Sequence, residues 1–161
     1  MPLQNRTATV PPCYFVIFGA TGNLAAEKLF PALYALEAAQ RLSAALRFVA
    51  VGRREWALAE WQQYLLSTLQ DKMKKHVFDS VVANKLIQRF DYVTGDYAKA
   101  TAYQTLIDTL AQPHDFPEGT SCENIVFYLA IPPNDYMTVA THLHTSGSVS
   151  YTHLTLPTSD L

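Results

Sequence analysis

Four short apolar runs, separated by longer stretches of mixed polarity, organise the chain. The runs at 14–18 and 124–130 are rich in aromatic and β-branched residues and are followed closely by a glycine or a proline pair. A shorter run at 48–51 stops at a glycine, and residues 90–93 alternate between apolar and polar. These runs predict strands, and the first and last are typical of strands buried on both faces.

The stretches between these runs have helical composition or spacing. In the first of them apolar side chains recur near helical spacing, and Pro31 inside it predicts a kink or a restart of the helix. The predicted helices cover about 24–40, 57–75, 77–88, 98–111 and 135–144. Strands that alternate with helices predict crossover units, and therefore an α/β fold with a doubly wound parallel sheet that is covered on both faces.

Composition narrows the class of protein. The chain has 161 residues, 49% of them hydrophobic, which fits one domain with a core. Its formal net charge of −2 gives no reason to expect nucleic acid or an acidic membrane as a partner. No apolar stretch approaches the roughly 18 residues that span a bilayer. Cys13 and Cys122 lie far apart in the sequence, so we interpret them as reduced thiols of a cytoplasmic protein.

A glycine-containing loop follows the first predicted strand and precedes the first predicted helix. Gly19 would permit a tight turn there, Gly22 would let the backbone approach a phosphate closely, and Thr21 could add a hydroxyl. The full dinucleotide pattern has three glycines, and here the third position holds Ala25, which is small enough for helix–strand packing. A strand, a glycine loop and a helix in this order predict nucleotide binding; the alternative is a plain strand-to-helix turn.

The end of the second predicted strand indicates which nucleotide is bound. NAD enzymes usually carry an acidic residue there, which accepts hydrogen bonds from the ribose 2′-hydroxyl. This chain has Arg53 and Arg54 instead, and the first carboxylate is that of Glu55. An arginine fork pairs well with a 2′-phosphate, so the sequence favours NADP over NAD. We expect one of the two arginines, Arg54, to be a solvated residue at a helix start.

Four motifs in order carry a resemblance to a known family. The segments GATGNLAAEKLFPALYAL (19–36), VAVGRREW (49–56), GDY (95–97) and FYLAIPP (127–133) resemble the N-terminal part of glucose-6-phosphate dehydrogenases. The resemblance covers about residues 13–145 and implies a Rossmann-like domain, here incomplete and ending before the family's C-terminal α+β domain. It implies oxidation of glucose 6-phosphate to 6-phosphogluconolactone with NADP, in the pentose phosphate pathway, by a homo-oligomeric parent enzyme.

The resemblance also implies a coenzyme site and one residue on the substrate side. Arg53 would hold the 2′-phosphate of NADP, and Asp96 and Tyr97 would lie along the coenzyme. Lys28 would reach toward the sugar phosphate, with a solvated helix lysine as the alternative. The other coenzyme positions of the family fall on Gly19, Ala20, Thr21, Gly22, Asn23, Leu24, Ala130 and Pro132.

The chain departs from the family in several places. Asn23 replaces the usual aspartate but keeps a side chain able to cap the helix, and Glu27 occupies a position that is often basic. The family's catalytic histidine segment and its Glu-Lys-Pro segment do not occur, so no catalytic residue is assigned. His142 and His144 are two residues apart, a poor spacing for a metal site on a helix. We expect the chain alone to bind coenzyme at most and to be inactive as an enzyme.

Two other classes of protein fit part of the pattern. Extended short-chain reductases and epimerases open with a similar glycine loop, but their Tyr-x-x-x-Lys pair does not occur here, and Ala25 replaces a glycine. The Lys28-Leu29-x-Pro31 sequence favours the dehydrogenase. A non-catalytic NADP-binding module that ends near residue 147 is the second alternative.

The expected domain organisation has three parts. Residues 1–12 are expected to be a flexible N-terminal segment, and residues 13–146 the partial NADP-binding domain. Residues 147–161 carry several Ser and Thr and show no strong helix signal and no recognisable partner element. They fit either an ordinary chain end or a sequence foreign to the gene, and we favour a non-native tail.

Overall fold

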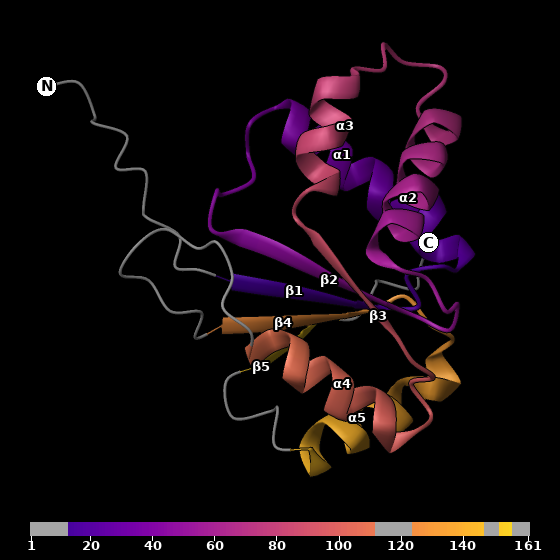
Figure 1. Ribbon diagram of the computed structural model, residues 1–161, viewed down its shortest axis with the longest axis vertical. Helices are drawn as coiled ribbons and strands as arrows, with labels where there is room; N and C mark the ends of the chain where they lie inside the picture. Colours follow the sequence, from indigo (N-terminus) through magenta and orange to yellow (C-terminus); the bar gives the residue numbers. More distant parts are fainter. Residues whose placement is uncertain (1–12, 112–123, 147–151, 156–161) are drawn as a thin grey trace, which may run out of the picture.

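One parallel sheet forms the centre of the molecule. The computed structural model describes residues 13–111, 124–146 and 152–155, and within them five strands are ordered β3-β2-β1-β4-β5. Strand β1 pairs in parallel with both β2 and β4, so the winding direction reverses at β1 (Figure 1). This is the doubly wound topology that the alternation of elements predicted. The strands are β1 (Cys13–Phe18), β2 (Leu46–Gly52), β3 (Phe90–Thr94), β4 (Asn124–Leu129) and β5 (Thr152–Thr155).

Helices cover both faces of the sheet. Figure 1 shows α1, α2 and α3 on one face, and α4 and α5 on the other. Helices α1 to α4 lie within stretches that the sequence predicted to be helical, α5 ends one residue beyond the predicted 135–144, and the short η2 was not predicted. The helical elements are η1 (Ala25–Leu29), α1 (Phe30–Ala38), α2 (Leu58–Lys72), α3 (Ser80–Ile87), α4 (Ala100–Ala111), η2 (Pro133–Asp135) and α5 (Tyr136–Thr145).

The sheet separates two apolar cores. Under α1–α3 the core is strongly aromatic: Phe30 meets Trp61 edge to face at 5.8 Å, and Phe48 stacks on Phe90 of the next strand at 4.8 Å. Under α4 and α5, Phe18 packs against Phe127. Aromatic side chains bury large apolar areas, so the two cores hold the strands from both sides. The expectation that β1 is buried on both faces is confirmed, because consecutive residues of β1 enter different cores.

Pro31 explains a change of helical geometry near the start of α1. A proline has no N–H, and its ring collides with the carbonyl four residues earlier in a regular helix. The turn just before α1, η1, is π-helical, and the Phe30 N–H donates to the Ala25 carbonyl. The predicted restart of the helix is confirmed, because Pro31 lies among the first positions of α1, where a missing N–H is tolerated.

Strand β5 is an element that the sequence did not predict. It lies within 147–161 and pairs in parallel with β4. The non-native origin of 147–161, the bounds of the domain and the flexibility of 1–12 remain predictions. Residues 1–12, 112–123 (which include Cys122), 147–151 and 156–161 lie outside the described residues. Cys13 is present as a thiol, which donates to the Tyr14 carbonyl at 3.4 Å. Among the described residues, no helix has the length and apolar character to span a membrane.

Arg89 joins three segments at the amino ends of the strands. Its Nη1 donates to the carbonyls of Ser43 and Leu46 at 2.6 and 3.0 Å. Its Nη2 lies 3.2 Å from Oε2 of Glu37, whose side chain is only 8% exposed. A guanidinium that serves two carbonyls and a buried carboxylate fixes the loop between α1 and β2 against the start of β3.

We predict that Arg89→Met lowers the free energy of unfolding by about 2–4 kcal/mol, because it leaves the Glu37 carboxylate buried without its cation. Urea denaturation followed by tryptophan fluorescence measures this change. Arg41→Met, which removes the same charge from an exposed side chain, should change the free energy by less than about 0.5 kcal/mol. Equal losses in the two variants would contradict the role given to the Arg89 contacts.

Candidate coenzyme site

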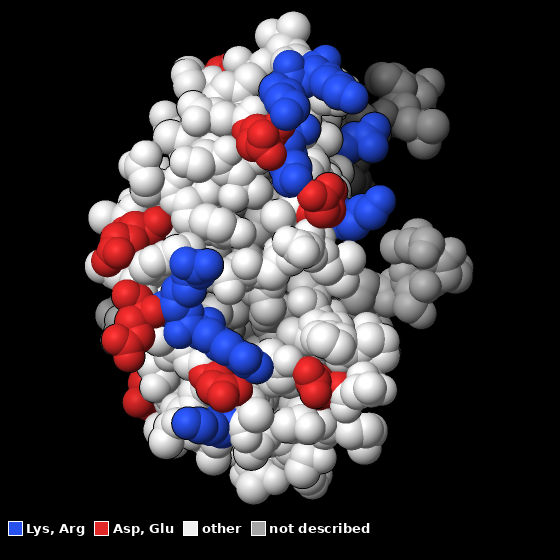
Figure 2. Space-filling model, turned by 90° about the vertical axis from the view of Figure 1, so that its right-hand side faces the viewer, with Lys and Arg blue, Asp and Glu red and all other residues white. Residues whose placement is uncertain are grey.

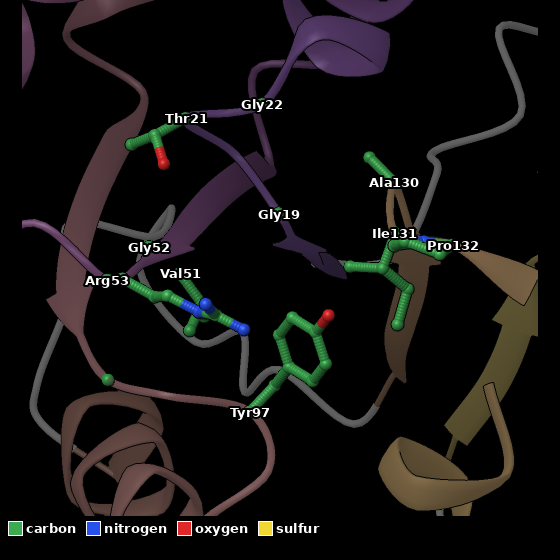
Figure 3. Close-up of a pocket in the computed structure, with 11 residues that line it drawn as sticks. Gly19, Thr21, Gly22, Val51, Gly52, Arg53, Tyr97, Ala130, Ile131 and Pro132 are labelled. Atoms are coloured by element: carbon green, nitrogen blue, oxygen red, sulfur yellow. The ribbon is translucent and has the colours of Figure 1, made fainter. Parts of the chain in front are cut away.

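A hollow of about 180 Å³ lies where the loops that follow β1, β2, β3 and β4 converge (Figure 3). These strands are parallel, so their carboxyl ends meet at one edge of the sheet. The order of the strands reverses at β1, and ligands of doubly wound sheets bind at this switch point. The hollow is lined by Gly19, Thr21, Gly22, Val51, Gly52, Arg53, Gly95, Tyr97, Ala130, Ile131 and Pro132.

Gly19 brings the loop after β1 against the turn after β4. Its φ is 78°, a conformation that side chains with a Cβ rarely adopt. A Cβ on Gly19 would lie 2.2 Å from the Ala130 carbonyl oxygen and 2.9 Å from Cγ2 of Ile131. The predicted tight turn at Gly19 is therefore present. Glycine is required there both by the backbone conformation of the loop and by the close approach of the residues that follow β4.

Gly52 allows a second close approach, between the glycine loop and the end of β2. A Cβ there would lie 2.8 Å from the Tyr92 hydroxyl and 2.9 Å from Cγ2 of Thr21. The Ala20 N–H donates to the Val51 carbonyl at 3.2 Å, which fixes the same contact through the backbone. Figure 3 shows the result: Thr21 and Gly22 lie on one side of the hollow, and Arg53 and Tyr97 lie on the other.

Arg53 and Tyr97 contact each other across loops from two strands. The Arg53 guanidinium carbon lies 5.5 Å from the centre of the Tyr97 ring, a cation–π geometry. The Tyr97 hydroxyl donates to Oδ2 of Asp135 at 2.5 Å. Burial raises the pKa of the Tyr97 hydroxyl, and the hydrogen bond to Asp135 raises it further. Tyr97 is therefore a neutral donor at physiological pH.

Arg54 lies apart from the hollow although it is next to Arg53 in sequence. Its guanidinium carbon lies 5.3 Å from the centre of the Trp56 ring, and its side chain is exposed. Its carbonyl accepts hydrogen bonds from the hydroxyls of Tyr92 and Thr94 at 2.7 and 3.1 Å. The side chain precedes α2 and is solvated, as the sequence analysis expected of Arg54.

The structure brings together only part of the site that the family resemblance implied. Asp96 does not line the hollow, because its Oδ1 accepts from the Ala98 N–H at 2.9 Å and closes its own loop. Leu24 packs against the first core, and Asn23 and Lys28 are exposed outside the lining. The predicted residues that do line the hollow are Gly19, Thr21, Gly22, Arg53, Tyr97, Ala130 and Pro132, whereas Ala20, Asn23, Leu24, Lys28 and Asp96 do not.

Four lining residues were missed by the sequence analysis: Val51, Gly52, Gly95 and Ile131. Three of them lie next to assigned residues in the motifs, so the motif positions themselves contained a signal. At Gly95 the reason for glycine is a helix, since a Cβ would lie 2.6 Å from Cβ of Ala102. That contact depends on how α4 packs, which the local sequence does not reveal.

The charged groups around the hollow suit an anionic ligand. Among the described residues that line the hollow, Arg53 is the one cation, and none is Asp, Glu or His. On the side of the molecule seen in Figure 2, Lys and Arg lie beside Asp and Glu. An anion is therefore attracted by local groups such as Arg53, not by a uniformly basic surface. In the part of the chain that the structure describes, no group of His, Cys, Asp and Glu could hold a metal ion.

A doubly wound parallel sheet with a glycine turn at its switch point defines a dinucleotide-binding domain. The family model for the NAD binding domain of glucose-6-phosphate dehydrogenase matches residues 16–155. The chain therefore belongs to the glucose-6-phosphate dehydrogenase family. This membership supports a nicotinamide coenzyme and decides against the extended short-chain reductases.

Curated relatives and solved structures agree with this assignment. The chain is 35% identical over 136 residues to glucose-6-phosphate 1-dehydrogenase 2 of Mycobacterium tuberculosis, covering 84% of this chain and 26% of that protein. It is 31% identical over 147 residues to the Bacillus subtilis glucose-6-phosphate 1-dehydrogenase, covering 91% and 28%. The fold matches the crystal structure of the Mycobacterium avium enzyme with a TM-score of 0.74 at 23% identity, covering 91% and 29%. The chain thus spans less than a third of these relatives.

We predict that Gly19→Ala lowers the free energy of unfolding by about 2–4 kcal/mol, because the methyl group collides with the Ala130 carbonyl and the positive φ is strained. Gly22→Ala is the matched control: its Cβ would come no closer than 3.3 Å to the Gly19 carbonyl oxygen. That variant should lose less than about 1 kcal/mol. Urea denaturation measures both, and a Gly19→Ala chain as stable as the wild type would contradict the described close approach.

Proposed function

We propose that this chain binds NADP in the hollow at the switch point, as the coenzyme-binding part of a glucose-6-phosphate dehydrogenase. The observation that carries the proposal is the position of Arg53. Its side chain follows β2 directly and lines the hollow, at the place where NAD-binding domains carry a carboxylate. A guanidinium there favours a 2′-phosphate over a 2′-hydroxyl.

The other lining residues support the same orientation of the coenzyme. The pyrophosphate would lie by the loop of Gly19, Thr21 and Gly22, where glycines let the backbone approach. The nicotinamide would lie by the turn that contains Ala130 and Pro132, next to β1 in the sheet. Bound there, the coenzyme supplies the hydride acceptor.

The substrate and reaction of the whole enzyme are part of the proposal. The relatives are glucose-6-phosphate 1-dehydrogenases, and one similar solved structure, at 22% identity, is a glucose-6-phosphate dehydrogenase in complex with glucose 6-phosphate. We propose that the parent enzyme oxidises this sugar phosphate with NADP in the pentose phosphate pathway. The cytoplasmic location and the homo-oligomeric state remain predictions from the sequence.

Catalysis needs a general base within hydrogen-bond reach of the sugar hydroxyl, and the lining of the hollow offers no His, Asp or Glu. His142, from α5, stacks on Tyr103 at 4.9 Å and lies outside the lining. Lys28, the residue proposed for the substrate side, is exposed and lies outside the lining. We therefore propose that the described residues bind the coenzyme and do not by themselves turn it over.

We predict that Arg53→Gln weakens NADP binding about 10- to 100-fold and changes NAD binding by less than about twofold, because only NADP has the phosphate that the guanidinium would hold. Arg54→Gln, the neighbouring control, should leave both affinities within about twofold. Isothermal titration calorimetry on the 161-residue chain measures all four changes. An equal loss of NADP and NAD binding in Arg53→Gln would contradict the 2′-phosphate role.

We predict that the chain alone forms no NADPH from NADP and glucose 6-phosphate, because its hollow lacks a general base. The measurement is the absorbance of NADPH over hours at high protein concentration. The full-length Bacillus subtilis relative provides the positive control. Turnover that follows the concentration of the chain and disappears in Arg53→Gln would contradict the prediction.

A further inference from the structure

Three side chains form a continuous line beside the hollow, and each comes from a different crossover loop. Arg53 follows β2, Tyr97 follows β3, and Asp135 ends η2 after β4. Arg53 lies over the Tyr97 ring at 5.5 Å, and the Tyr97 hydroxyl donates to Asp135 at 2.5 Å. Figure 3 shows the Tyr97 ring between Arg53 and the turn of Ile131 and Pro132.

The backbone at Tyr97 and Ala98 is held by contacts that do not involve Asp135. The Tyr103 hydroxyl of α4 donates to the Tyr97 carbonyl at 2.7 Å, and Nε2 of His142 lies 3.2 Å from the Ala98 carbonyl. These contacts fix where the Tyr97 backbone lies, but not the direction of its ring. At the far end of the ring, the Tyr97 hydroxyl is held by the Asp135 carboxylate.

We propose that Asp135 is a positioning residue for the coenzyme: by holding the Tyr97 hydroxyl, it keeps the ring under Arg53 and the guanidinium at the hollow. This inference rests on the proposed binding of NADP. A long arginine side chain loses conformational freedom when it binds a phosphate, so a ring that already restricts it lowers the cost of binding. A phenol that donates to a carboxylate also has a more electron-rich ring, which attracts a cation more strongly.

Asp135 has a competing effect on an anionic coenzyme. Its charge repels phosphate, and removal of that charge alone would tighten NADP binding. Figure 3 shows Arg53 on one side of the Tyr97 ring and the turn of Ile131 and Pro132 on the other, and the Asp135 carboxylate accepts from the hydroxyl of that ring. Solvent weakens the repulsion between partly exposed charges, whereas the hydrogen bond acts through direct contact. The positioning of Arg53 through Tyr97 therefore outweighs the repulsion between the Asp135 carboxylate and the coenzyme phosphate.

The two effects predict opposite results for one variant. Asp135→Ala removes both the charge and the acceptor, and we expect NADP to bind about fivefold more weakly, with NAD changed by less than about twofold. Repulsion alone would predict tighter NADP binding. The side chain of Asp135 makes no capping hydrogen bond to α5, so the variant does not remove a helix cap. Thermal unfolding followed by circular dichroism checks that the variant is folded.

Three companion variants separate positioning from a general structural effect. Asp135→Asn keeps a neutral acceptor oxygen and should restore most of the NADP affinity. Tyr97→Phe should weaken NADP binding as Asp135→Ala does, and the double variant should be no weaker than either single variant, because both act through one hydrogen bond. Asp108→Asn removes a carboxylate from the exposed side of α4 and should leave both affinities unchanged.

The outcomes distinguish this inference from the proposed function. If the wild-type chain prefers NADP and Arg53→Gln removes the preference, while Asp135→Ala binds NADP normally or more tightly, only the role of Asp135 is overturned. Additive losses in the double variant, or equal losses of NADP and NAD, would overturn it as well. A wild-type chain that binds neither coenzyme would overturn both proposals.

Discussion

The contact between the backbone of Gly19 and the carbonyl of Ala130 is the constraint on which the site depends. The two residues follow β1 and β4, which pair in parallel with Phe18 opposite Leu129. The Ala130 N–H donates to the Phe18 carbonyl at 3.0 Å, so the backbone pairing of β1 and β4 continues to the last residue before the two loops begin. From there one loop turns to the face of α1 and the other leads to α5. The hollow exists because the loops that follow β1 and β4 diverge immediately beyond this contact.

Stabilising contacts and binding contacts lie at opposite ends of the strands. At the amino ends, the Arg89 guanidinium satisfies the carbonyls of Ser43 and Leu46 and the carboxylate of Glu37. At the carboxyl ends, the Arg53 guanidinium lies over the Tyr97 ring and interacts with its hydroxyl. A guanidinium that joins two carbonyls and a carboxylate stabilises the fold, whereas one that contacts a single tyrosine keeps most of its five donors available for a ligand.

The sequence predicted what depends on local composition and missed what depends on tertiary packing. Strands β1 to β4 were predictable because their apolar runs are bounded by glycine or proline. Strand β5 was not, because Thr152–Thr155 is short and contains a single apolar residue, Leu154, so its local composition does not indicate a strand. Gly52 was missed for a similar reason: the Tyr92 hydroxyl that excludes a Cβ comes from β3. Asp96 was assigned to the coenzyme, but it makes a local hydrogen bond to Ala98 that motif matching does not consider.

The different surroundings of Arg53 and Arg54 show how the fold assigns roles to neighbouring residues of one type. The hydroxyls of Tyr92 and Thr94, both on β3, donate to the Arg54 carbonyl and fix the backbone just after Arg53. Burial raises the pKa of the Tyr92 hydroxyl, so it remains a donor above neutral pH. With this backbone fixed, one guanidinium lies over Tyr97 and the other over Trp56. The proposed selection of the coenzyme phosphate would therefore depend on β3, which supplies the hydrogen bonds that fix the backbone beside Arg53, as well as on the arginine itself.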